Sequence, residues 1–269
     1  SRHEKEFAQI NASWSYENQS LTPQEKELLY GQLNQENPLR RGNVSGVNKV
    51  SSQYCYPGTT VLINHFDIRD QEELHHVERI HTARRALEMR FDPIKGNFDL
   101  EHLQAIHRHL FQDVYPFAGE IRTVNIGKNN HWFCEKNMIS RLADTVFSEL
   151  KNDRVLKGLS EDAFASKAAY YYTEVNYMHP FREGNGRSIR EFFSQMAREA
   201  NHELHWQNVS KEEYFAAVKK TDDPKNLKDL EDVFKRCLQP DRDLIQQWMI
   251  PTEEMTLKDL LKKVEGMPA

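Results

Sequence analysis

Apolar residues recur every three to four positions along most of the chain, which is the spacing of one helix face. In residues 70–90 this spacing is kept by Leu74, Val77, Ile80, Ala83 and Leu87. Asp70 is a suitable N-cap for that segment, with Glu73 three residues later. Similar stripes cover residues 99–113, 135–151, 160–177, 184–200, 210–221 and 226–238. The pattern predicts a mainly α-helical fold.

Residues 121–134, IRTVNIGKNNHWFC, depart from the helical pattern. Their β-branched and aromatic side chains flank Gly127-Lys128-Asn129-Asn130, which favours a turn. The segment therefore predicts one β-hairpin. Taken alone, it is typical of an ordinary surface hairpin.

Residues 38–53 contain Pro, Gly, Ser and Asn but almost no side chains that could build a core, so we interpret them as a linker. The linker separates an N-terminal helical unit, residues 1–37, from a core of residues 54–239. The short unit is expected to dock on the core, because so few residues rarely fold alone. Residues 240–269 form a C-terminal tail with no assigned role.

The chain has 269 residues and a formal net charge of -5, which disfavours a general nucleic-acid or membrane-surface binder. The three cysteines are far apart and form no CxxC pair, so neither a zinc site nor a disulfide framework is expected. Reduced thiols indicate a cytoplasmic protein. No apolar run approaches the roughly 18 residues of a membrane span.

One short stretch, MHPFREGNGRSIR at 178–190, gathers most of the candidate chemistry. Pro180 favours an extended His179 and an end to the preceding helix. Gly184 and Gly186 permit a tight loop that leads into a new helix. A glycine-rich loop at a helix N-terminus directs N–H groups at one point, and such a nest binds phosphate oxygens.

The charged residues of this stretch fit the same chemistry. Arg187 and Arg190 are three residues apart, so both can lie over one face and bind phosphate. Glu183 can hold Mg²⁺, and His179 can accept a proton from an attacking hydroxyl. Each feature alone has an ordinary explanation as a helix end, a turn or a solvated face. Together they favour transfer of a phosphate-containing group.

The stretch matches, position for position, the Fic-domain signature HxFx(D/E)GNGRxxR. The segments around Tyr54, residues 70–90 and Phe117-AGEIRTVNI also resemble the Fic core, so the resemblance covers about residues 54–239. It implies a Fic-fold helical bundle with one β-hairpin flap over the active site. It also implies a protein adenylyltransferase that moves AMP from ATP to a Ser, Thr or Tyr hydroxyl of a target protein.

The resemblance assigns the reacting groups. It implies that His179 is the catalytic base for the target hydroxyl and that Glu183 holds Mg²⁺ between the α- and β-phosphates of ATP. ATP and Mg²⁺ are therefore the expected substrate and cofactor.

The resemblance also assigns the phosphate contacts. Gly184, Asn185 and Gly186 would form the anion nest, Arg187 would stabilise the leaving diphosphate, and Arg190 would contact the γ-phosphate. In the family, the hairpin is a flap that pairs with an extended segment of the target. Residues 124–133 match that flap here, and its expected target-binding residues are Ile126, Gly127, Lys128 and His131.

An off-switch is expected in the N-terminal unit. Ser13-Trp-Ser-Tyr-Glu17-Asn18 matches the inhibitory pattern (S/T)xxxE(G/N) of Fic proteins, at the end of a short helical run. Glu17 would share a helix face with Ser13 and pair with Arg190, the guanidinium meant for the γ-phosphate. The alternative is that Glu17 merely ends a solvated helix.

Other functions stay open at this stage. The chain could use another nucleotide donor, or remove AMP from a modified target with Glu17 orienting water. It could also be a toxin–antitoxin interaction module with catalysis held off. A DNA-binding regulator is disfavoured by the acidic balance. An oligomer of the chain is compatible with the sequence.

Overall fold

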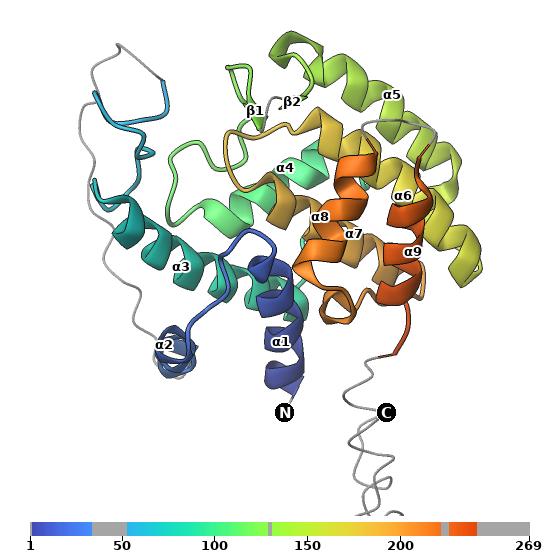
Figure 1. The fold of residues 1–269 in the computed structure, drawn as a ribbon, viewed down its shortest axis with the longest axis horizontal. Helices are drawn as coiled ribbons and strands as arrows, with labels where there is room; N and C mark the ends of the chain where they lie inside the picture. Colours follow the sequence, from blue (N-terminus) through green and yellow to red (C-terminus); the bar gives the residue numbers. More distant parts are fainter. Residues whose placement is uncertain (1, 34–52, 129–130, 222–225, 241–269) are drawn as a thin grey trace, which may run out of the picture.

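The computed structural model describes residues 2–33, 53–128, 131–221 and 226–240, and its helices pack into one bundle (Figure 1). The α-helices are α1 (Arg2–Ser15), α2 (Pro23–Leu33), α3 (Gln71–Phe91), α4 (Leu100–Phe111), α5 (Ile139–Asn152), α6 (Glu161–Met178), α7 (Asn185–Glu199), α8 (Lys211–Lys220) and α9 (Lys228–Cys237). Three short 3₁₀ turns join them: η1 (Lys136–Met138), η2 (Arg154–Leu156) and η3 (Trp206–Asn208).

The prediction of a mainly helical fold is confirmed. Helices α3 to α9 lie in the segments that the apolar stripes predicted, and four of them, α3, α4, α6 and α8, begin with a side-chain cap. The side chains of Asp70, Asp99, Ser160 and Ser210 each accept a hydrogen bond from the backbone N–H three residues later. Such a cap satisfies one of the N–H groups that a helix start leaves without an intrahelical partner.

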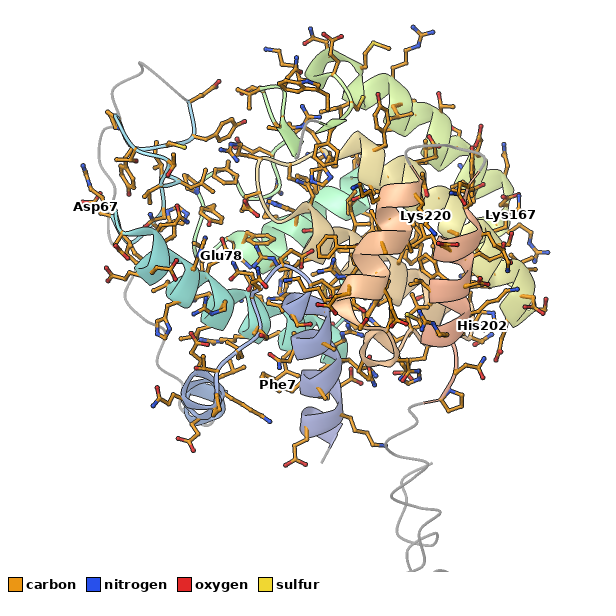
Figure 2. All side chains as sticks on the ribbon, viewed as in Figure 1. Phe7, Asp67, Glu78, Lys167, His202 and Lys220 are labelled. Carbon is orange, nitrogen blue, oxygen red and sulfur yellow. The ribbon has the colours of Figure 1, made fainter. Side chains whose placement is uncertain are left out.

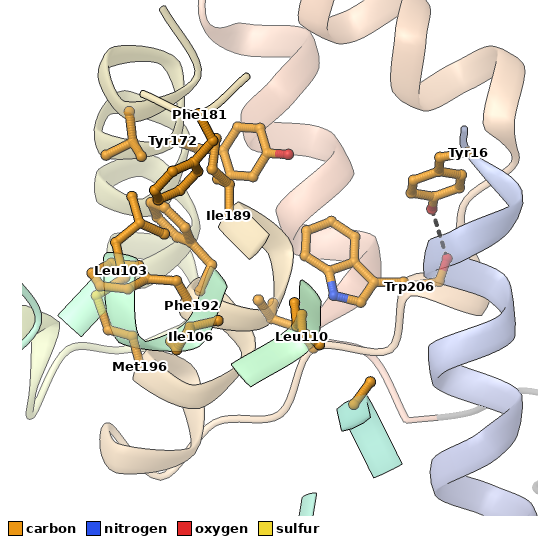
Figure 3. Packing of buried hydrophobic residues seen from close by; sticks show 14 of the residues in the cluster. Tyr16, Leu103, Ile106, Leu110, Tyr172, Phe181, Ile189, Phe192, Met196 and Trp206 are labelled. Carbon is orange, nitrogen blue, oxygen red and sulfur yellow. Dashed lines mark hydrogen bonds between the residues drawn. The ribbon is translucent and has the colours of Figure 1, made fainter. Parts of the chain in front are cut away.

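Helix α7 runs through the middle of the bundle and contacts α1, α4 and α6. Its side chains Ile189, Phe192, Phe193 and Met196 are all 0% exposed. Figure 3 shows this core, in which α7 packs against α4 through residues such as Leu103 and Ile106. The motif of residues 178–190 therefore leads into a deeply buried helix, and its side chains are fixed by the packing around them.

The N-terminal unit belongs to the same core. Helix α1 packs against α3, α7 and η3, and its Phe7, Ile10 and Trp14 are at most 2% exposed. The Trp14 indole donates a hydrogen bond to Thr82 Oγ1 at 2.9 Å, and the Tyr16 hydroxyl donates to the Trp206 carbonyl at 2.8 Å (Figure 3).

Helix α2 extends this docked unit beside α3. Phe7 of α1, labelled in Figure 2, lies under the Lys26 ammonium of α2 at 5.1 Å. The carboxylate of Glu25 is buried and bonds to the Arg79 and His76 side chains of α3. The structure does not describe residues 34–52 and 241–269, which include all of the expected linker (38–53) except Gln53 and all of the expected tail (240–269) except Pro240.

The hairpin is present but shorter than the sequence pattern suggested. Strands β1 (Gly127–Lys128) and β2 (His131–Trp132) pair antiparallel, with Gly127 opposite Trp132. Gly127 and Lys128 thus lie in a strand instead of the turn, and Asn129 and Asn130 lie outside the described residues. The Ile126 carbonyl accepts one more hydrogen bond, from Phe133 N–H.

Two expectations about the chain's environment can be compared with the structure. The three cysteines, Cys55, Cys134 and Cys237, are buried thiols without a disulfide. In the described part of the chain, no helix is long and apolar enough to cross a membrane.

Candidate active site

His179 ends α6 in a conformation that the sequence did not predict. Its backbone has φ 43° and ψ 59°, the left-handed region, so the expected extended conformation is wrong. The N–H of His179 still donates to Val175 O, which makes the residue a left-handed C-cap of the helix. A non-glycine residue here costs roughly 1–2 kcal/mol, so the surrounding contacts must stabilise it.

The His179 ring has a defined orientation and protonation pattern. Its Nδ1 lies 2.9 Å from the Asn176 carbonyl oxygen, and a carbonyl can only accept, so Nδ1 carries the proton. In the neutral ring this leaves the lone pair on Nε2. The ring stacks on Phe133, just after β2, with centroids 3.6 Å apart and planes 9° apart. The imidazole is therefore held between the end of α6 and the hairpin.

The loop between α6 and α7 is closed by an amide. Asn185 Oδ1 accepts from Phe181 N–H at 2.9 Å, and its Nδ2 donates to Phe181 O at 2.8 Å. Phe181 is 0% exposed, in agreement with an anchoring role. Gly184 has φ +77°, and a Cβ there would lie 2.2 Å from the Phe111 ring, so only glycine fits. The Asn185 side chain is thus engaged within the loop, and the N–H of Gly184 donates to Glu183 Oε1 at 2.9 Å.

His107 supports this loop from α4, which the sequence did not indicate. Its Nε2 donates to the Glu183 carbonyl at 2.9 Å, and its Nδ1 accepts from Gly119 N–H at 2.8 Å. The ring also stacks on Phe181, with centroids 3.9 Å apart. Burial lowers the pKa of His107 to about 3, so the imidazole is neutral. A neutral ring can donate at one nitrogen and accept at the other, as these contacts require.

Arg187 is buried beside two carboxylates. Its Nη2 lies 2.6 Å from Glu78 Oε1 and 3.7 Å from Glu183 Oε1, and its guanidinium carbon lies 4.8 Å from the Phe111 ring centre. The Nε and Nη1 atoms of Arg187 are buried without a hydrogen-bond partner among the described residues. This guanidinium thus has donors to spare for an anion.

Glu78 is a site residue that the hydrophobic pattern missed. That pattern put Val77 on the inner face of α3, yet Val77 is only partly buried, whereas the side chain of Glu78 is 2% exposed. Besides Arg187, the Glu78 carboxylate accepts a hydrogen bond from the Tyr115 hydroxyl. Figure 2 labels Glu78 on α3. A lone carboxylate on a helix gives no sequence signal for its partner across the bundle.

Arg190 is the most fully enclosed charge of the site, with a side chain that is 0% exposed. Its Nε donates to Ser13 Oγ at 2.7 Å, and its Nη2 donates to the Ser13 carbonyl at 2.9 Å. Its Nη1 donates to Glu17 Oε1 at 2.8 Å, and its Nη2 also bonds Glu17 Oε2. Burial opposes the charge, but the Glu17 carboxylate outweighs it and raises the pKa of Arg190.

Aromatic rings complete the surroundings of Arg190. The guanidinium carbon lies 5.1 Å from the ring centre of Tyr16 and 5.5 Å from that of Tyr214, within the range of cation–π attraction. The two rings stack, with centroids 4.4 Å apart. The chain segment that carries Glu17 is therefore held to α8 by its neighbour Tyr16.

Glu17 and Ser13 both reach Arg190, although not from one helix face as expected. Helix α1 ends at Ser15, and Glu17 follows in a turn where its N–H donates to Trp14 O. The Glu17 carboxylate covers Gly186, where a Cβ would lie 2.3 Å from Oε1. It therefore lies against the first turn of α7, at the place where the sequence predicted an anion nest.

The two motif arginines do not lie over one face. Arg187 reaches toward α3 and Glu78, whereas Arg190 reaches toward α1 and Glu17. A cavity of about 340 Å³ adjoins both contacts. It is lined by Tyr16, Glu17, Asn18, Gln19, Leu62, Gln71, His75, Glu78, Tyr115, Glu183, Arg187, Lys211 and Phe215. The cavity has the size of a small-molecule site and carries groups of both charges.

The flap residues are only partly described. Ile126 and Gly127 lie at the start of the hairpin, and the side chains of Lys128 and His131 lie outside the described part of the structure. The Trp132 side chain in β2 is 69% exposed.

Comparison with known proteins places these features in a family. Residues 97–197 match the model of the Fic/DOC family. The chain is 43% identical over 158 residues to the probable protein adenylyltransferase y4lH of Sinorhizobium fredii. The matched region spans 58% of this chain and 81% of y4lH. It is 41% identical over 160 residues to protein adenylyltransferase VbhT of Bartonella schoenbuchensis, and the match spans 60% of this chain but only 34% of VbhT.

Solved structures agree with this assignment. BepC protein from Bartonella tribocorum with bound AMPPNP is 27% identical, with a TM-score of 0.63 over 70% of this chain and 97% of that one. The fold, the motif and the extensive match to y4lH lead to one conclusion. The chain belongs to the Fic/DOC family.

Proposed function

We propose that this protein is a protein adenylyltransferase that transfers AMP from ATP to a Ser, Thr or Tyr hydroxyl of a target protein. The observation that carries the proposal is the arrangement at the start of α7. Glu183 and Arg187 line a cavity at this helix start, Arg190 is buried against Glu17, and His179 precedes the loop with its lone pair on Nε2. The relatives named as adenylyltransferases support the same reaction.

In the proposed step, His179 Nε2 takes the proton of the target hydroxyl as its oxygen attacks the α-phosphorus. The new P–O bond forms while the bond from the α-phosphorus to the β-phosphate oxygen breaks, and diphosphate leaves. The unused Nε and Nη1 donors of Arg187 support its role toward the diphosphate. N–H groups of Asn185 and Gly186, at the start of α7, would bind phosphate oxygens.

The residues present fit Mg²⁺ bound together with the nucleotide. No group of three or more His, Cys, Asp or Glu side chains that could hold a metal occurs in the described part of the chain. Mg²⁺ in phosphoryl-transfer sites commonly uses one or two carboxylates and takes other ligands from phosphates and water. The Glu183 carboxylate, 44% exposed and lining the cavity, suits that role. When bound, the ion would neutralise charge on the phosphates.

We further propose that Glu17 holds the enzyme off. Its carboxylate occupies Arg190 through both oxygens and covers Gly186, so it would exclude the γ-phosphate by competition and by charge repulsion. The buried side chains of Trp14 and Tyr16, which precede Glu17 in the chain, keep the carboxylate there. A release that moves only the turn around Glu17 would leave the apolar contacts of α1 intact. Residues 1–37 would then act as the inhibitory unit, and residues 54–239 as the catalytic core.

The hairpin would serve as the docking site for the target. Its residues Ile126 and Gly127 lead into β1, and Phe133 after β2 contacts His179, so a target segment paired with the hairpin would lie near the base. Lys128 and His131 are retained as candidate target contacts on sequence grounds alone.

The proposal is tested by incubating cell lysate with ATP and the Glu17→Gly variant, followed by mass spectrometry for AMP on hydroxyl side chains. We expect labelled proteins with Glu17→Gly, weak labelling with the wild type and none with Glu17→Gly/His179→Ala. Equal labelling by wild type and Glu17→Gly would remove the inhibitory role. Persistent labelling without His179 would refute its role as the catalytic base.

The same assay separates the other functions. A comparison of ATP, GTP, CTP and UTP as donors detects a different nucleotide preference. Loss of AMP from a previously modified target, dependent on Glu17, would indicate hydrolytic removal of AMP. No turnover of any nucleotide by the Glu17→Gly variant would leave the interaction module as the function.

A further inference from the structure

Arg122 is a buried cation whose guanidinium bonds to backbone carbonyls. Arg122 is 2% exposed, and no Asp or Glu among the described residues pairs with its charge. Buried charges normally need a counter-charge or a full set of hydrogen bonds. Arg122 is compensated by hydrogen bonds, because its guanidinium donates to four backbone carbonyls: those of Met178, His179, Val124 and Cys134.

These carbonyls belong to two separate parts of the active site. The His179 carbonyl accepts from Nε at 2.8 Å, and that of Met178 lies 3.4 Å from Nη2. Both stand at the C-terminal end of α6, where carbonyls have no partner within the helix. The backbone N–H of Arg122 also donates to Pro180 O at 2.8 Å. Three consecutive carbonyls, from Met178 to Pro180, are thus held by one residue.

The other two carbonyls flank the hairpin. Val124 precedes β1 and accepts from Nη1 at 2.7 Å, whereas Cys134 follows β2 and accepts from Nη2. The N–H of Cys134 returns the connection by donating to Tyr177 O at 3.0 Å. Because the guanidinium is planar and rigid, it fixes the two ends of the hairpin relative to the end of α6.

The base depends on the same contacts. His179 has the left-handed backbone that L-residues rarely adopt, and its carbonyl is one of the four acceptors of Arg122. Its ring stacks on Phe133, which stands between the hairpin and Cys134. Arg122 therefore holds the His179 backbone directly, and it holds the His179 ring through the position of Phe133.

We propose that Arg122 is a positioning residue that joins the hairpin and the base into one unit, so that a target segment bound to the hairpin meets an imidazole already oriented for proton transfer. This inference rests on the proposed adenylyltransferase function. Arg122 itself contacts main-chain groups and does not line the cavity where the nucleotide would bind. Its loss should therefore reduce the transfer step and leave nucleotide affinity unchanged.

The test uses the full chain with Glu17→Gly as the active parent. Arg122→Lys keeps the charge but replaces the planar fork by a single point donor. Arg85→Lys is the matched control, because Arg85 also makes several hydrogen bonds, to Asp113 and Glu88, but away from the site. Arg122→Gln is the second variant, which avoids burial of an ammonium group if Arg122→Lys does not fold.

Two measurements are made on each variant. The first is kcat for AMP transfer together with the Kd for a non-hydrolysable ATP analogue. We expect Arg122→Lys to lower kcat by about 100-fold, the scale of a 1 Å misplacement, with Kd changed less than about twofold. The second is hydrogen exchange at the amides of Phe133 and Cys134, which should become at least about tenfold faster. Arg85→Lys should change neither.

The outcomes separate this inference from the proposed function. An inactive Glu17→Gly parent would refute AMP transfer, and the exchange rates would still decide whether Arg122 holds the hairpin. An active parent with unchanged kcat in both Arg122 variants would overturn the positioning role. So would unchanged exchange at Cys134, or a loss of kcat that Arg85→Lys reproduces.

Discussion

Replacement of Glu17 by glutamine removes the charge that faces Arg190 and keeps the size of the side chain. The guanidinium keeps its bonds to Ser13 Oγ and Ser13 O, at 2.7 and 2.9 Å, so the fold around it should persist. What changes is the competition between the carboxylate and a γ-phosphate for one buried cation. The Glu17 side chain is 26% exposed and that of Arg190 is 0% exposed, so solvent screens the pair only weakly.

The size of the effect follows from the two bonds that the carboxylate makes. Hydrogen bonds to charged groups contribute about 1.5–3 kcal/mol, and each 1.4 kcal/mol is tenfold in affinity. We therefore expect Glu17→Gln to tighten binding of a non-hydrolysable ATP analogue by about 10- to 100-fold. ADP has no γ-phosphate, so its affinity should change less than about threefold.

Isothermal titration calorimetry with both nucleotides measures this difference directly. Glu25→Gln is the control, because it removes another buried acidic contact of the N-terminal unit but leaves Glu17 on Arg190. Equal tightening of ATP and ADP in Glu17→Gln would show that the carboxylate does not compete with the γ-phosphate. A comparable gain in Glu25→Gln would assign inhibition to docking of the whole unit.

Other predictions follow from the same contacts. Gly184→Ala should lower the free energy of unfolding by about 2–4 kcal/mol in denaturant titrations, because both the backbone conformation and the packing oppose a Cβ. Gly158→Ala should lower it by only about 1 kcal/mol, because Gly158 has φ +78° but no atom within 4 Å of a Cβ. Burial acts to raise the pKa of Glu25, but hydrogen bonds from α3 and the α2 cap outweigh it and lower the pKa below 4.5. The stability that Glu25 adds is therefore present above that pH and lost as pH falls through the folded pKa, so the difference in Tm between wild type and Glu25→Gln should shrink in acid. Glu78→Gln should cost about 3–5 kcal/mol in thermal unfolding, because it leaves Arg187 buried without its main counter-charge, and saturating ATP should restore part of the loss. A Tm difference for Glu25→Gln that is constant with pH, or no ATP rescue of Glu78→Gln, would contradict these assignments.

Features set by local sequence could be predicted. Apolar stripes and capping residues lie within one helix, so helix positions followed from neighbours in the chain. The motif at 178–190 is equally local, because a loop and a helix start place its groups within a few residues of each other. The contact between Glu17 and Arg190 spans 173 residues, and only the resemblance to the family indicated it.

Contacts across the bundle gave no such signal. Glu78 is buried because Arg187 meets it from α7, and no periodicity on α3 shows that. The rule that favours an extended residue before proline considers only the clash with the proline ring, so it mispredicted the backbone of His179. Its left-handed conformation is held by the helix end and by the guanidinium of Arg122, which stands 57 residues earlier.

The central claim is that the site transfers AMP, and the position of a radioactive label in ATP tests it most directly. The Glu17→Gly variant is incubated with a target-containing lysate and ATP labelled at either the α- or the γ-phosphate. The account predicts protein-bound label from α-labelled ATP alone, with γ-label recovered as diphosphate, and no incorporation once His179 is replaced by alanine. Protein-bound label from γ-labelled ATP, or none from either, would contradict it.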